Sequence, residues 1–337
     1  MKWTVIGAGG IADRRAIPAI LKDKDSELVA IMERVPALAK TLGEKYGVPY
    51  FTAIEEMLET IDCDAVYIGT PVKCHLEQAM TALRYGKHAF IEKPIAMNAD
   101  EGERLVKAFK EAGKQLTIGY MMKYHNLHQQ AKEYIKQGGI GQVNDIRVQF
   151  SCWYPEIEGA WRQKKELGGG GVLIDIAVHG IELVEYLLDE EITDVRAFYS
   201  TRTFGYEVED SGVFIFKTAS GVLGHMDVNF NIPDNASESK LELYGSKGYI
   251  VCKGTLGQEE NGTLSYLYAP QGDYSAAQSR NATPVPTLFS AGGEDLYLKQ
   301  MLEFRACVEK NAPDYFYAER AVQVQRVIDA IYACEQP

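Results

Sequence analysis

The alternation of short apolar runs with helical segments over the first 120 residues constrains the fold of this chain most strongly. Five runs rich in Val, Ile or Ala are expected to form strands, at residues 3–7, 27–32, 65–70, 88–92 and 115–119. Segments with helical period lie between them, at residues 11–22, 36–47, 74–85 and 99–112. Strands that alternate with helices form a parallel sheet with helices on both faces. We therefore expect an α/β fold with a doubly wound N-terminal domain.

The pattern changes from about residue 140. Apolar runs now follow one another across short Gly or Ser turns, at residues 141–154, 192–201, 211–230 and 241–252. This succession is typical of an antiparallel sheet. Helices that pack on this sheet or return to the first domain are expected at residues 173–188, 294–309 and 318–334. A long irregular loop is expected at residues 254–293, which are rich in Gly, Ser, Asn, Gln and Pro.

Length and composition limit the organisation and the partners. A chain of 337 residues is long enough for two domains, which we place at residues 1–122 and 123–337. A net charge of -12 disfavours binding to nucleic acid, and no apolar run approaches the ~20 residues that a membrane helix needs. The first residues lack the features of a secretory signal, and the six cysteines form no C-x-x-C pair. These features predict a cytoplasmic protein with reduced thiols and a small-molecule partner.

A glycine-rich turn follows the first expected strand. The sequence VIGAGGIA contains G-x-G-x-x-A, in which Gly7 allows a tight turn and Gly9 lets the backbone approach a pyrophosphate. Gly10, Ile11 and Ala12 complete the turn and begin a helix, whose N-terminus favours negative charge. The position of the motif in the first strand–turn–helix unit predicts a dinucleotide site.

Further cofactor contacts are expected at the ends of later strands. Glu33 ends the second expected strand, 21 residues after the G-x-G-x-x-A motif, where a carboxylate binds the ribose 2′-hydroxyl. The prediction is therefore NAD, although the adjacent Arg34 could pair with a 2′-phosphate and leaves NADP open. Thr70 and Pro71 lie at the carboxyl end of another expected strand, where open α/β sheets bind ligands. His75 follows and is included in this site.

Two stretches carry candidate catalytic residues. The run AFIEKPIA ends a buried strand in Glu92 and Lys93, which places both in the expected ligand crevice. The proline after Lys93 favours an extended conformation that can direct the lysine side chain there. The run GGGGVLIDIAVHGIE places Asp175 and His179 four residues apart, on one face of an expected helix behind four glycines.

These residue types suit alcohol oxidation coupled to hydride transfer. His179 can accept or donate the hydroxyl proton near neutral pH, because histidine has a reference pKa of ~6.5. Asp175 can bind the substrate hydroxyl or hold the imidazole, and Lys93 can stabilise a developing alkoxide. A purely structural Asp175–His179 hydrogen bond is an alternative. A metal site made with Glu182 is disfavoured, because no further ligand stands at suitable spacing.

The order of these motifs resembles the Gfo/Idh/MocA family of sugar and polyol dehydrogenases, over essentially the whole chain. The resemblance rests on G-x-G-x-x-A, T-P before a histidine, E-K-P, and glycines followed by D-x-x-x-H. It implies a Rossmann domain followed by an α/β domain with a large, mostly antiparallel open sheet. It also implies that Lys93, Asp175 and His179 are catalytic, and that the exposed face of the second sheet forms a homodimer or homotetramer.

Some positions depart from the family pattern. Ala177 and Glu182 stand where the family often has Gly and Asp, and Lys123 and Asn126 stand where it commonly has Arg and Pro. The second pair puts the substrate contact expected at Lys123 in doubt.

Aromatic residues ahead of the glycine run suggest a ring-shaped substrate. Trp153, Tyr154 and Trp161 can pack on the apolar face of a sugar, and Arg162 can donate hydrogen bonds to its hydroxyls. Tyr120 and His125 are further candidates by position, and Lys123 is also assigned to the substrate site. Alternatively, the tryptophans cap the sheet as core or interface residues.

Three functions remain open from the sequence. The leading hypothesis is an NAD(P)-dependent oxidoreductase that interconverts a secondary hydroxyl and a ketone on a sugar, glycoside or cyclic polyol. A second enzyme class would use tightly bound NAD to oxidise a sugar transiently and so cleave a glycoside. A non-catalytic sensor of NAD and sugar is disfavoured because the Lys, Asp and His residues are all present.

Overall fold

The structure is a computed structural model that describes residues 1–270, 272, 276 and 284–334. The first sheet, sheet A, has the strand order β3-β2-β1-β4-β5-β6, and its neighbouring strands are all parallel. The strands are Lys2–Ile6 (β1), Glu27–Met32 (β2), Tyr50–Phe51 (β3), Ala65–Ile68 (β4), His88–Ile91 (β5) and Leu116–Ile118 (β6). This is the expected doubly wound α/β arrangement. Only the two-residue strand β3 was not predicted.

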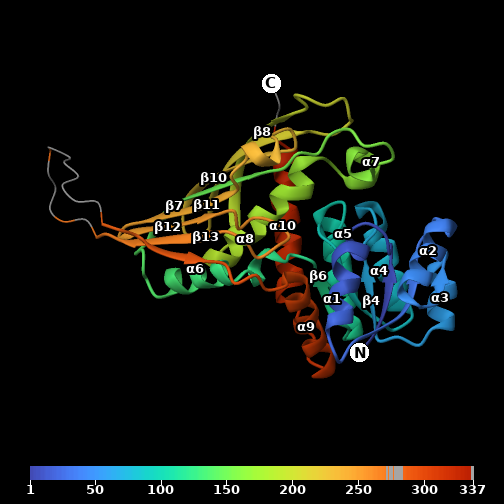
Figure 1. The fold of residues 1–337 in the computed structure, drawn as a ribbon. Coiled ribbons are helices and arrows are strands. Elements are labelled where there is room, and N and C mark those ends of the chain that lie inside the picture. The colour runs from blue at the N-terminus through green and yellow to red at the C-terminus, as the bar shows by residue number, and fades with distance from the viewer. Residues whose placement is uncertain (271, 273–275, 277–283, 335–337) are drawn as a thin grey trace.

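Helices cover both faces of sheet A (Figure 1). They are the π-helical turn Ala12–Ala16 (η1), Ile17–Lys22 (α1), Pro36–Tyr46 (α2), Ile54–Thr60 (α3), His75–Arg84 (α4) and Ala99–Ala112 (α5). Helix α5 shows why the predicted bounds agree. The Asn98 side chain caps its start by accepting a hydrogen bond from the Glu101 amide, and Gly113 ends it in the left-handed region at φ 63°. Helix α3 was not predicted from the sequence.

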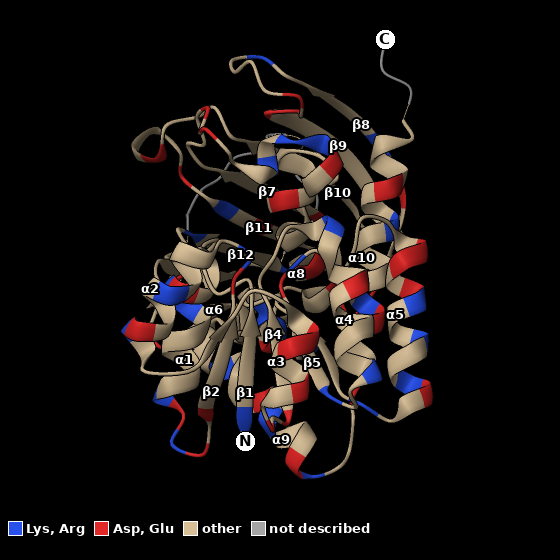
Figure 2. Ribbon diagram, turned by 90° about the vertical axis from the view of Figure 1, so that its right-hand side faces the viewer, with Lys and Arg blue, Asp and Glu red and all other residues tan. Residues whose placement is uncertain are grey.

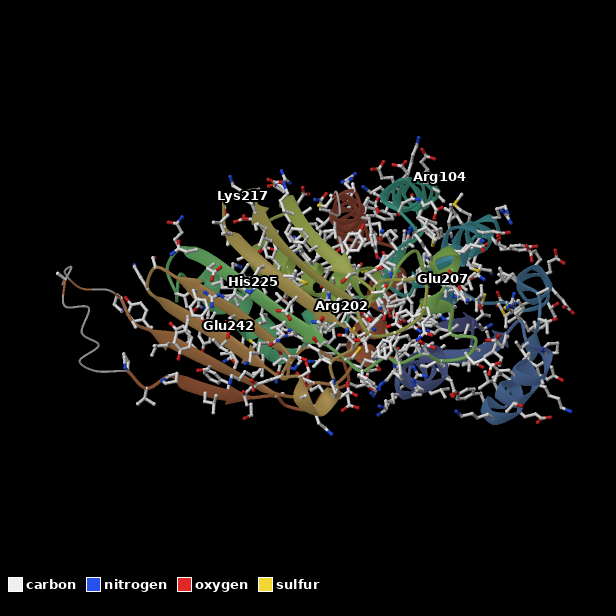
Figure 3. All side chains as sticks on the ribbon, turned by 90° about the horizontal axis from the view of Figure 1, so that it is seen from above. Arg104, Arg202, Glu207, Lys217, His225 and Glu242 are labelled. Atoms are coloured by element: carbon white, nitrogen blue, oxygen red, sulfur yellow. The ribbon has the colours of Figure 1, made fainter. Side chains whose placement is uncertain are left out.

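The second sheet, sheet B, has the order β14-β13-β12-β11-β7-β10-β9-β8 and is antiparallel except for the parallel pair β7–β10. The strands in the half of sheet B that ends at β8 are Val143–Ser151 (β7), Ile192–Ser200 (β8), Ser211–Thr218 (β9) and Leu223–Asn229 (β10). The others are Lys240–Gly245 (β11), Gly248–Lys253 (β12), Thr263–Tyr268 (β13) and Thr287–Ser290 (β14). Helices Asn126–Lys136 (α6) and Val178–Leu188 (α8) pack on one face, and Figure 3 shows the other face without covering helices.

One sequence-based expectation was wrong in part. Residues 254–293 were expected to be irregular, but β13 and β14 lie within them and extend sheet B from β12. Tyr134 explains part of this, because its ring stacks on Tyr266 of β13 at 4.3 Å between centroids. The free energy gained from strand pairing and ring stacking stabilises these strands, although their local composition favours strands only weakly. Part of the expected loop, residues 271, 273–275 and 277–283, lies outside the described residues.

Two C-terminal helices connect the two halves. Helix Phe316–Tyr332 (α10) lies between the sheets in Figure 1 and packs on α5, α8 and β8. Helix Leu296–Glu309 (α9) packs against sheet A. The Phe304 ring lies 4.9 Å from the Trp3 ring and 5.8 Å from the Phe90 ring, measured between centroids. Within the described ranges, no helix combines the length and apolar character needed to cross a membrane.

Candidate active site

The candidate active site lies where the carboxyl ends of sheet A meet the second half of the chain. Lys93 follows β5, and its ammonium donates hydrogen bonds to the Asp175 side chain at 2.8 Å and to the Asp175 carbonyl at 2.5 Å. Arg162 donates from Nε to the same Asp175 oxygen at 3.1 Å. The carboxylate is thus held between two cations that come from different parts of the sequence. The structure therefore brings together two of the expected catalytic residues, Lys93 and Asp175, and the Asp175 carboxylate bonds to Lys93 and Arg162, whereas the sequence had suggested that it holds the His179 imidazole.

The glycine run lets other groups approach the helix that carries Asp175. A Cβ atom on Gly171 would lie 2.0 Å from the Glu209 carbonyl, and one on Gly170 would lie 1.9 Å from the Tyr332 hydroxyl. The Glu209 carboxylate accepts hydrogen bonds from the Gly171 amide at 2.9 Å and from the Tyr332 hydroxyl at 2.7 Å. The glycines are therefore needed for close approach. These contacts fix the start of the helix and hence the position of Asp175.

Asp175 lies in a π-helical turn, Leu173–Ala177 (η5), which leads into α8. Such turns are rare and occur frequently at functional sites. Burial acts to raise the pKa of Asp175, but the charges of Lys93 and Arg162 outweigh it and hold this pKa well below the usual range. The carboxylate is therefore ionised at neutral pH.

His179 lies one turn further along the same helix and is only 5% exposed. Its ring contacts Tyr120 edge-to-face, with 5.9 Å between centroids, and its Nδ1 has no hydrogen-bond partner among the described residues. Burial, together with the positive charge of Lys93, lowers the pKa of His179 well below 6.5. The imidazole is therefore neutral at pH 7 and able to accept a proton.

The charges of this cluster sum to a small positive value. Lys93 and Arg162 supply two positive charges, Asp175 supplies one negative charge, and His179 is neutral. A site with net positive charge and a neutral base suits a hydroxyl that becomes an alkoxide. Glu92 lies beneath Lys93, where burial raises its pKa and the Tyr67 hydroxyl donates to it at 2.5 Å.

The glycine-rich turn after β1 has a backbone that fits a dinucleotide. Gly7 adopts φ 73°, and a Cβ there would lie 2.6 Å from the Thr70 side chain. Gly10 adopts φ 58° and has open space where its side chain would be. Ile11 precedes η1, which begins at Ala12 without a side-chain cap, and the start of a helix favours the negative charge of a pyrophosphate.

An acidic residue lies where a ribose would bind. Glu33 follows β2, and its carboxylate lies 3.4 Å from the Gly9 amide, so it reaches over the glycine-rich turn. Arg34 is exposed beside it. A carboxylate in this position fits the hydroxyls of an NAD ribose and repels a 2′-phosphate. Thr70 and Pro71 are half-buried at the neighbouring strand end, with the Thr70 hydroxyl 2.6 Å from Gln78.

Two residues that the sequence analysis assigned to the cofactor and substrate sites are buried in the protein. His75 is fully buried, and its ring nitrogens lie 2.9 Å from the Pro94 carbonyl and 3.0 Å from the Thr70 carbonyl. It therefore supports two segments of the site through the backbone, and does not offer a free nitrogen to the cofactor. Lys123 is 3% exposed and faces Glu182, so the expected contact of its ammonium with substrate does not fit this burial.

Lys123 and Glu182 are two of the departures from the family pattern, and they meet in one place. Their charged atoms are 3.7 Å apart in the interior, and the Lys123 ammonium also lies 3.5 Å from the centre of the Tyr317 ring. A buried charge needs a partner of opposite sign, so the two departures are physically connected. The sequence alone treats them as separate small differences.

The aromatic candidates take different positions. Arg162 lies over the Trp161 ring at 4.2 Å, beside Asp175, and both side chains are partly exposed. Trp153 is 43% exposed and contacts Phe204 edge-to-face at 5.2 Å. Tyr154 is half-buried against Phe230.

Cavities and metal ligands do not add to this site. Clefts of about 770 and 1010 Å³ lie along α10, and none of their lining residues is Lys93, Asp175 or His179. The described part of the chain holds no group of three or more His, Cys, Asp or Glu side chains suited to a metal ion. The site is therefore identified from its charges and strand ends.

Several residues that hold the site in place could not be identified from the sequence. Glu209 and Tyr332 lie far along the chain from the glycine run that they contact, and Tyr67 lies on a different strand from Glu92. No spacing in the sequence connects such residues. The four glycines were the one available indication that something approaches the backbone closely.

Two family models match the chain. The model described as an oxidoreductase family with an NAD-binding Rossmann fold matches residues 1–120. The model described as the GFO/IDH/MocA C-terminal domain matches residues 128–251. Together they cover more than half of the chain.

Individual relatives agree with these matches. The 1,5-anhydro-D-fructose reductase of Ensifer adhaerens is 30% identical over 269 residues, which are 78% of this chain and 79% of that protein. The dTDP-3,4-didehydro-2,6-dideoxy-alpha-D-glucose 3-reductase of Actinomadura kijaniata is 26% identical and covers 97% of this chain and 93% of its own length. The solved aldose-aldose oxidoreductase of Caulobacter crescentus shares the fold, with a TM-score of 0.85, 24% identity and coverage of 98% and 96%. The protein therefore belongs to the GFO/IDH/MocA family of oxidoreductases, with an NAD-binding Rossmann fold over residues 1–120.

Proposed function

We propose that the protein interconverts a secondary hydroxyl and a ketone on a sugar, glycoside or cyclic polyol, with NAD as the hydride carrier. The observation that carries this proposal is the cluster of Lys93, Asp175 and His179, in which Lys93 follows β5 at the same edge of sheet A as the glycine-rich turn after β1. The names of relatives that act on an anhydrofructose and on a dTDP-linked deoxysugar support a carbohydrate substrate.

Each residue of the cluster has a proposed task. When bound, NAD would supply the acceptor for the hydride of the carbon that carries the hydroxyl, and NADH would supply the hydride for the ketone. His179 takes the hydroxyl proton, and Lys93 stabilises the negative charge that develops on the oxygen. Asp175 positions the Lys93 ammonium and the Arg162 guanidinium, which we propose also donates to a substrate hydroxyl.

Other residues around the cluster are proposed to contact the substrate and the cofactor. We propose that Trp161 and Trp153 present aromatic faces to the sugar ring and that Tyr154 lines the same side. Gly9 and Gly10 would hold the pyrophosphate, and Thr70 and Pro71 would lie against the dinucleotide. Glu33 would hold the adenosine ribose.

The cofactor assignment makes Glu33→Ala informative. This substitution is expected to raise the Kd for NAD by about 10-fold or more, because a hydrogen bond to a charged group contributes about 1.5–3 kcal/mol. It should also narrow the preference for NAD over NADP, since Arg34 would then face a 2′-phosphate without an opposing carboxylate. Titration of both dinucleotides against wild type, Glu33→Ala and the surface control Glu44→Ala tests this. An unchanged Kd for NAD would remove Glu33 from the site.

The reaction class is tested by absorbance at the reduced nicotinamide band. Purified protein is mixed with NAD or NADP and a panel of sugars, glycosides, inositols and their keto forms. We expect a change in absorbance with one group of carbohydrates and with NAD preferred. Substrate turnover without net production or consumption of reduced nicotinamide would contradict the proposal and favour transient oxidation by bound NAD.

We also propose that the protein forms a homodimer or homotetramer through the open face of sheet B. Figure 3 shows Lys217, His225 and Glu242 on this face, and apolar side chains lie among such polar ones. Phe198, Ile215 and Leu223 are each about 60% exposed there. A contiguous exposed apolar patch marks an interaction surface.

Ile215→Lys is expected to shift the protein toward the monomer, because it places a charge in the middle of that face. Sedimentation equilibrium of the variant and of a polar control, Lys217→Gln, measures the change in association constant. A monomeric wild type at micromolar concentration would contradict the proposed association.

A further inference from the structure

A row of ionisable side chains runs along the buried side of α8, starting at His179. Glu182 and Glu185 follow at three and six positions further, and these spacings keep all three side chains within one broad face of a helix. Glu182 is 2% exposed and Glu185 is 1% exposed. Two buried carboxylates behind a proposed proton acceptor are costly to maintain and have no part in the mechanism described so far.

Buried polar atoms that have no hydrogen-bond partner among the described residues lie around this row. Among the described residues, those with buried unpartnered atoms include the Tyr120 hydroxyl, His179 Nδ1, both Glu182 carboxylate oxygens, Glu185 Oε2 and Arg320 Nη1. The Tyr120 ring contacts His179 on one side, and the pKa of Tyr120 is raised by burial and by the charges of Glu182 and Glu185. Buried polar atoms in this condition are normally satisfied by internal water.

The row ends at a surface cleft. Glu185 and Arg320 both line the cleft of about 1010 Å³ between α5, α10 and the end of α8. Figure 2 shows acidic and basic residues along α5 and α10, which lie side by side there. The Ile192 amide holds one Glu185 oxygen at 3.0 Å, and the other oxygen has no partner in the described part of the chain. The buried row therefore runs from His179 in the candidate active site toward this cleft.

We propose that Tyr120, Glu182 and Glu185, with internal water, form a proton path between His179 and this cleft. The inference rests on the proposed function, in which His179 receives the hydroxyl proton. In the direction of oxidation, the hydride leaves for NAD and the proton passes from the hydroxyl oxygen to His179. The imidazolium then gives its proton through bridging water to Glu182, Glu182 passes a proton through internal water to Glu185, and Glu185 releases a proton to the cleft. Each transfer breaks one bond to hydrogen and forms another, so no further reactant is required.

The proton affinities along the row support this direction. Burial raises the pKa of Glu182 and lowers the pKa of Lys123, which brings the affinities of these two partners closer together. Burial also raises the pKa of Glu185 to about 8, so this side chain can gain and lose a proton near neutrality. Protonated His179 is a stronger acid than an exposed histidine because its pKa is lowered, and it therefore passes its proton on readily.

Charged groups on several neighbouring elements contribute to these shifts. They are Lys123 before α6, Lys132 on α6, Glu303 on α9, Arg320 on α10 and Glu191 after α8. The rings of Tyr124 and Tyr317 lie against the Lys123 ammonium. The charge of Lys123 lowers the pKa of Glu182 and so opposes the effect of burial. We accordingly assign Lys123 as a positioning residue for the path.

Glu182→Gln tests the path, because the amide keeps the shape of the side chain and cannot carry a proton in the same way. We expect kcat to fall by about 10-fold to 100-fold, the lower part of the range for proton-transfer residues, with little change in KM. The solvent deuterium isotope effect on kcat should rise, since proton release becomes limiting. Added imidazole should restore part of the rate by accepting the proton from His179 on the substrate side.

Two further variants make the result decisive. Glu185→Gln lies at the outlet and is expected to show a smaller loss with the same rescue. Glu260→Gln is the matched control, because Glu260 is also buried, at 3% exposed, but accepts a hydrogen bond from the Asn126 amide. The isotope effect of this variant should equal that of wild type. Thermal unfolding of all three variants separates loss of fold from loss of proton transfer.

The outcomes distinguish the path from the function on which it rests. Wild-type activity with unchanged kcat and isotope effect in Glu182→Gln and Glu185→Gln refutes the path alone. A slow Glu182→Gln that imidazole does not rescue, with a wild-type isotope effect, assigns Glu182 a structural role and also refutes it. A wild type that binds NAD and carbohydrate but transfers no hydride refutes the proposed function.

Discussion

Lys93→Met is expected to lower kcat/KM for the carbohydrate substrate by about 10³-fold, at the upper end of the effect of removing one electrostatic group from a reacting oxygen. The methionine keeps much of the side-chain volume but removes the ammonium that lies 2.8 Å from Asp175. The loss should appear mainly in kcat, because the negative charge on the oxygen develops only during the reaction. Steady-state kinetics with the substrate identified in the panel measures it.

A control lysine separates this effect from general surface charge. Lys107 is 77% exposed on α5, and Lys107→Met should retain wild-type kinetics. Binding of NAD to Lys93→Met, measured by titration, shows whether the cofactor site remains intact. Retention of kcat/KM within a few-fold of wild type in Lys93→Met would exclude Lys93 from catalysis.

His179→Asn is expected to lower kcat by about 10²-fold to 10⁴-fold, the range for a general acid or base. The pH dependence of the oxidation rate of the wild type should also reflect the pKa of His179. The base must be neutral, and its pKa is lowered below 6.5 by burial and by the charge of Lys93. Activity should therefore persist as the pH falls through 6.5 and decline only below it.

The sign of this pH effect is specific to the buried site. An exposed histidine would lose activity as a base around its ordinary pKa, which is higher. In Lys93→Met the repulsion from the ammonium is gone, so the acidic limb measured on the residual activity should move to higher pH. An acidic limb at or above pH 6.5 in wild type, unchanged in Lys93→Met, would contradict the assignment of His179.

Much of the fold could be predicted because local sequence signals and tertiary packing agree. Helix α5 has the predicted bounds, since the Asn98 cap and Gly113 define both ends within the segment itself. Strands β13 and β14 could not be predicted, because they depend on pairing with β12 and on the distant Tyr134. A strand whose stability comes from its neighbours leaves a weak local signal.

The candidate site shows the same division. Lys93 and Asp175 could each be proposed as site residues because each lies at a recognisable signal, the E-K-P end of a strand and the glycine run, but their ion pair was not predicted. The burial of His75 and Lys123 could not be predicted from the sequence. A polar residue near a strand end is normally expected to be exposed, and only the packing shows that these two are not. The pairing of Lys123 with Glu182 also depends on contact between α8 and a turn before α6.

The most direct test of the account follows deuterium from substrate to cofactor. The carbohydrate identified in the panel is prepared with deuterium on the carbon that bears the reacting hydroxyl, and one turnover is run with the protein and added NAD. The account predicts that mass spectrometry finds the deuterium in released NADH, and that Lys93→Met and His179→Asn slow its appearance. Product formed at the wild-type rate with no deuterium in the released dinucleotide would contradict net hydride transfer to NAD.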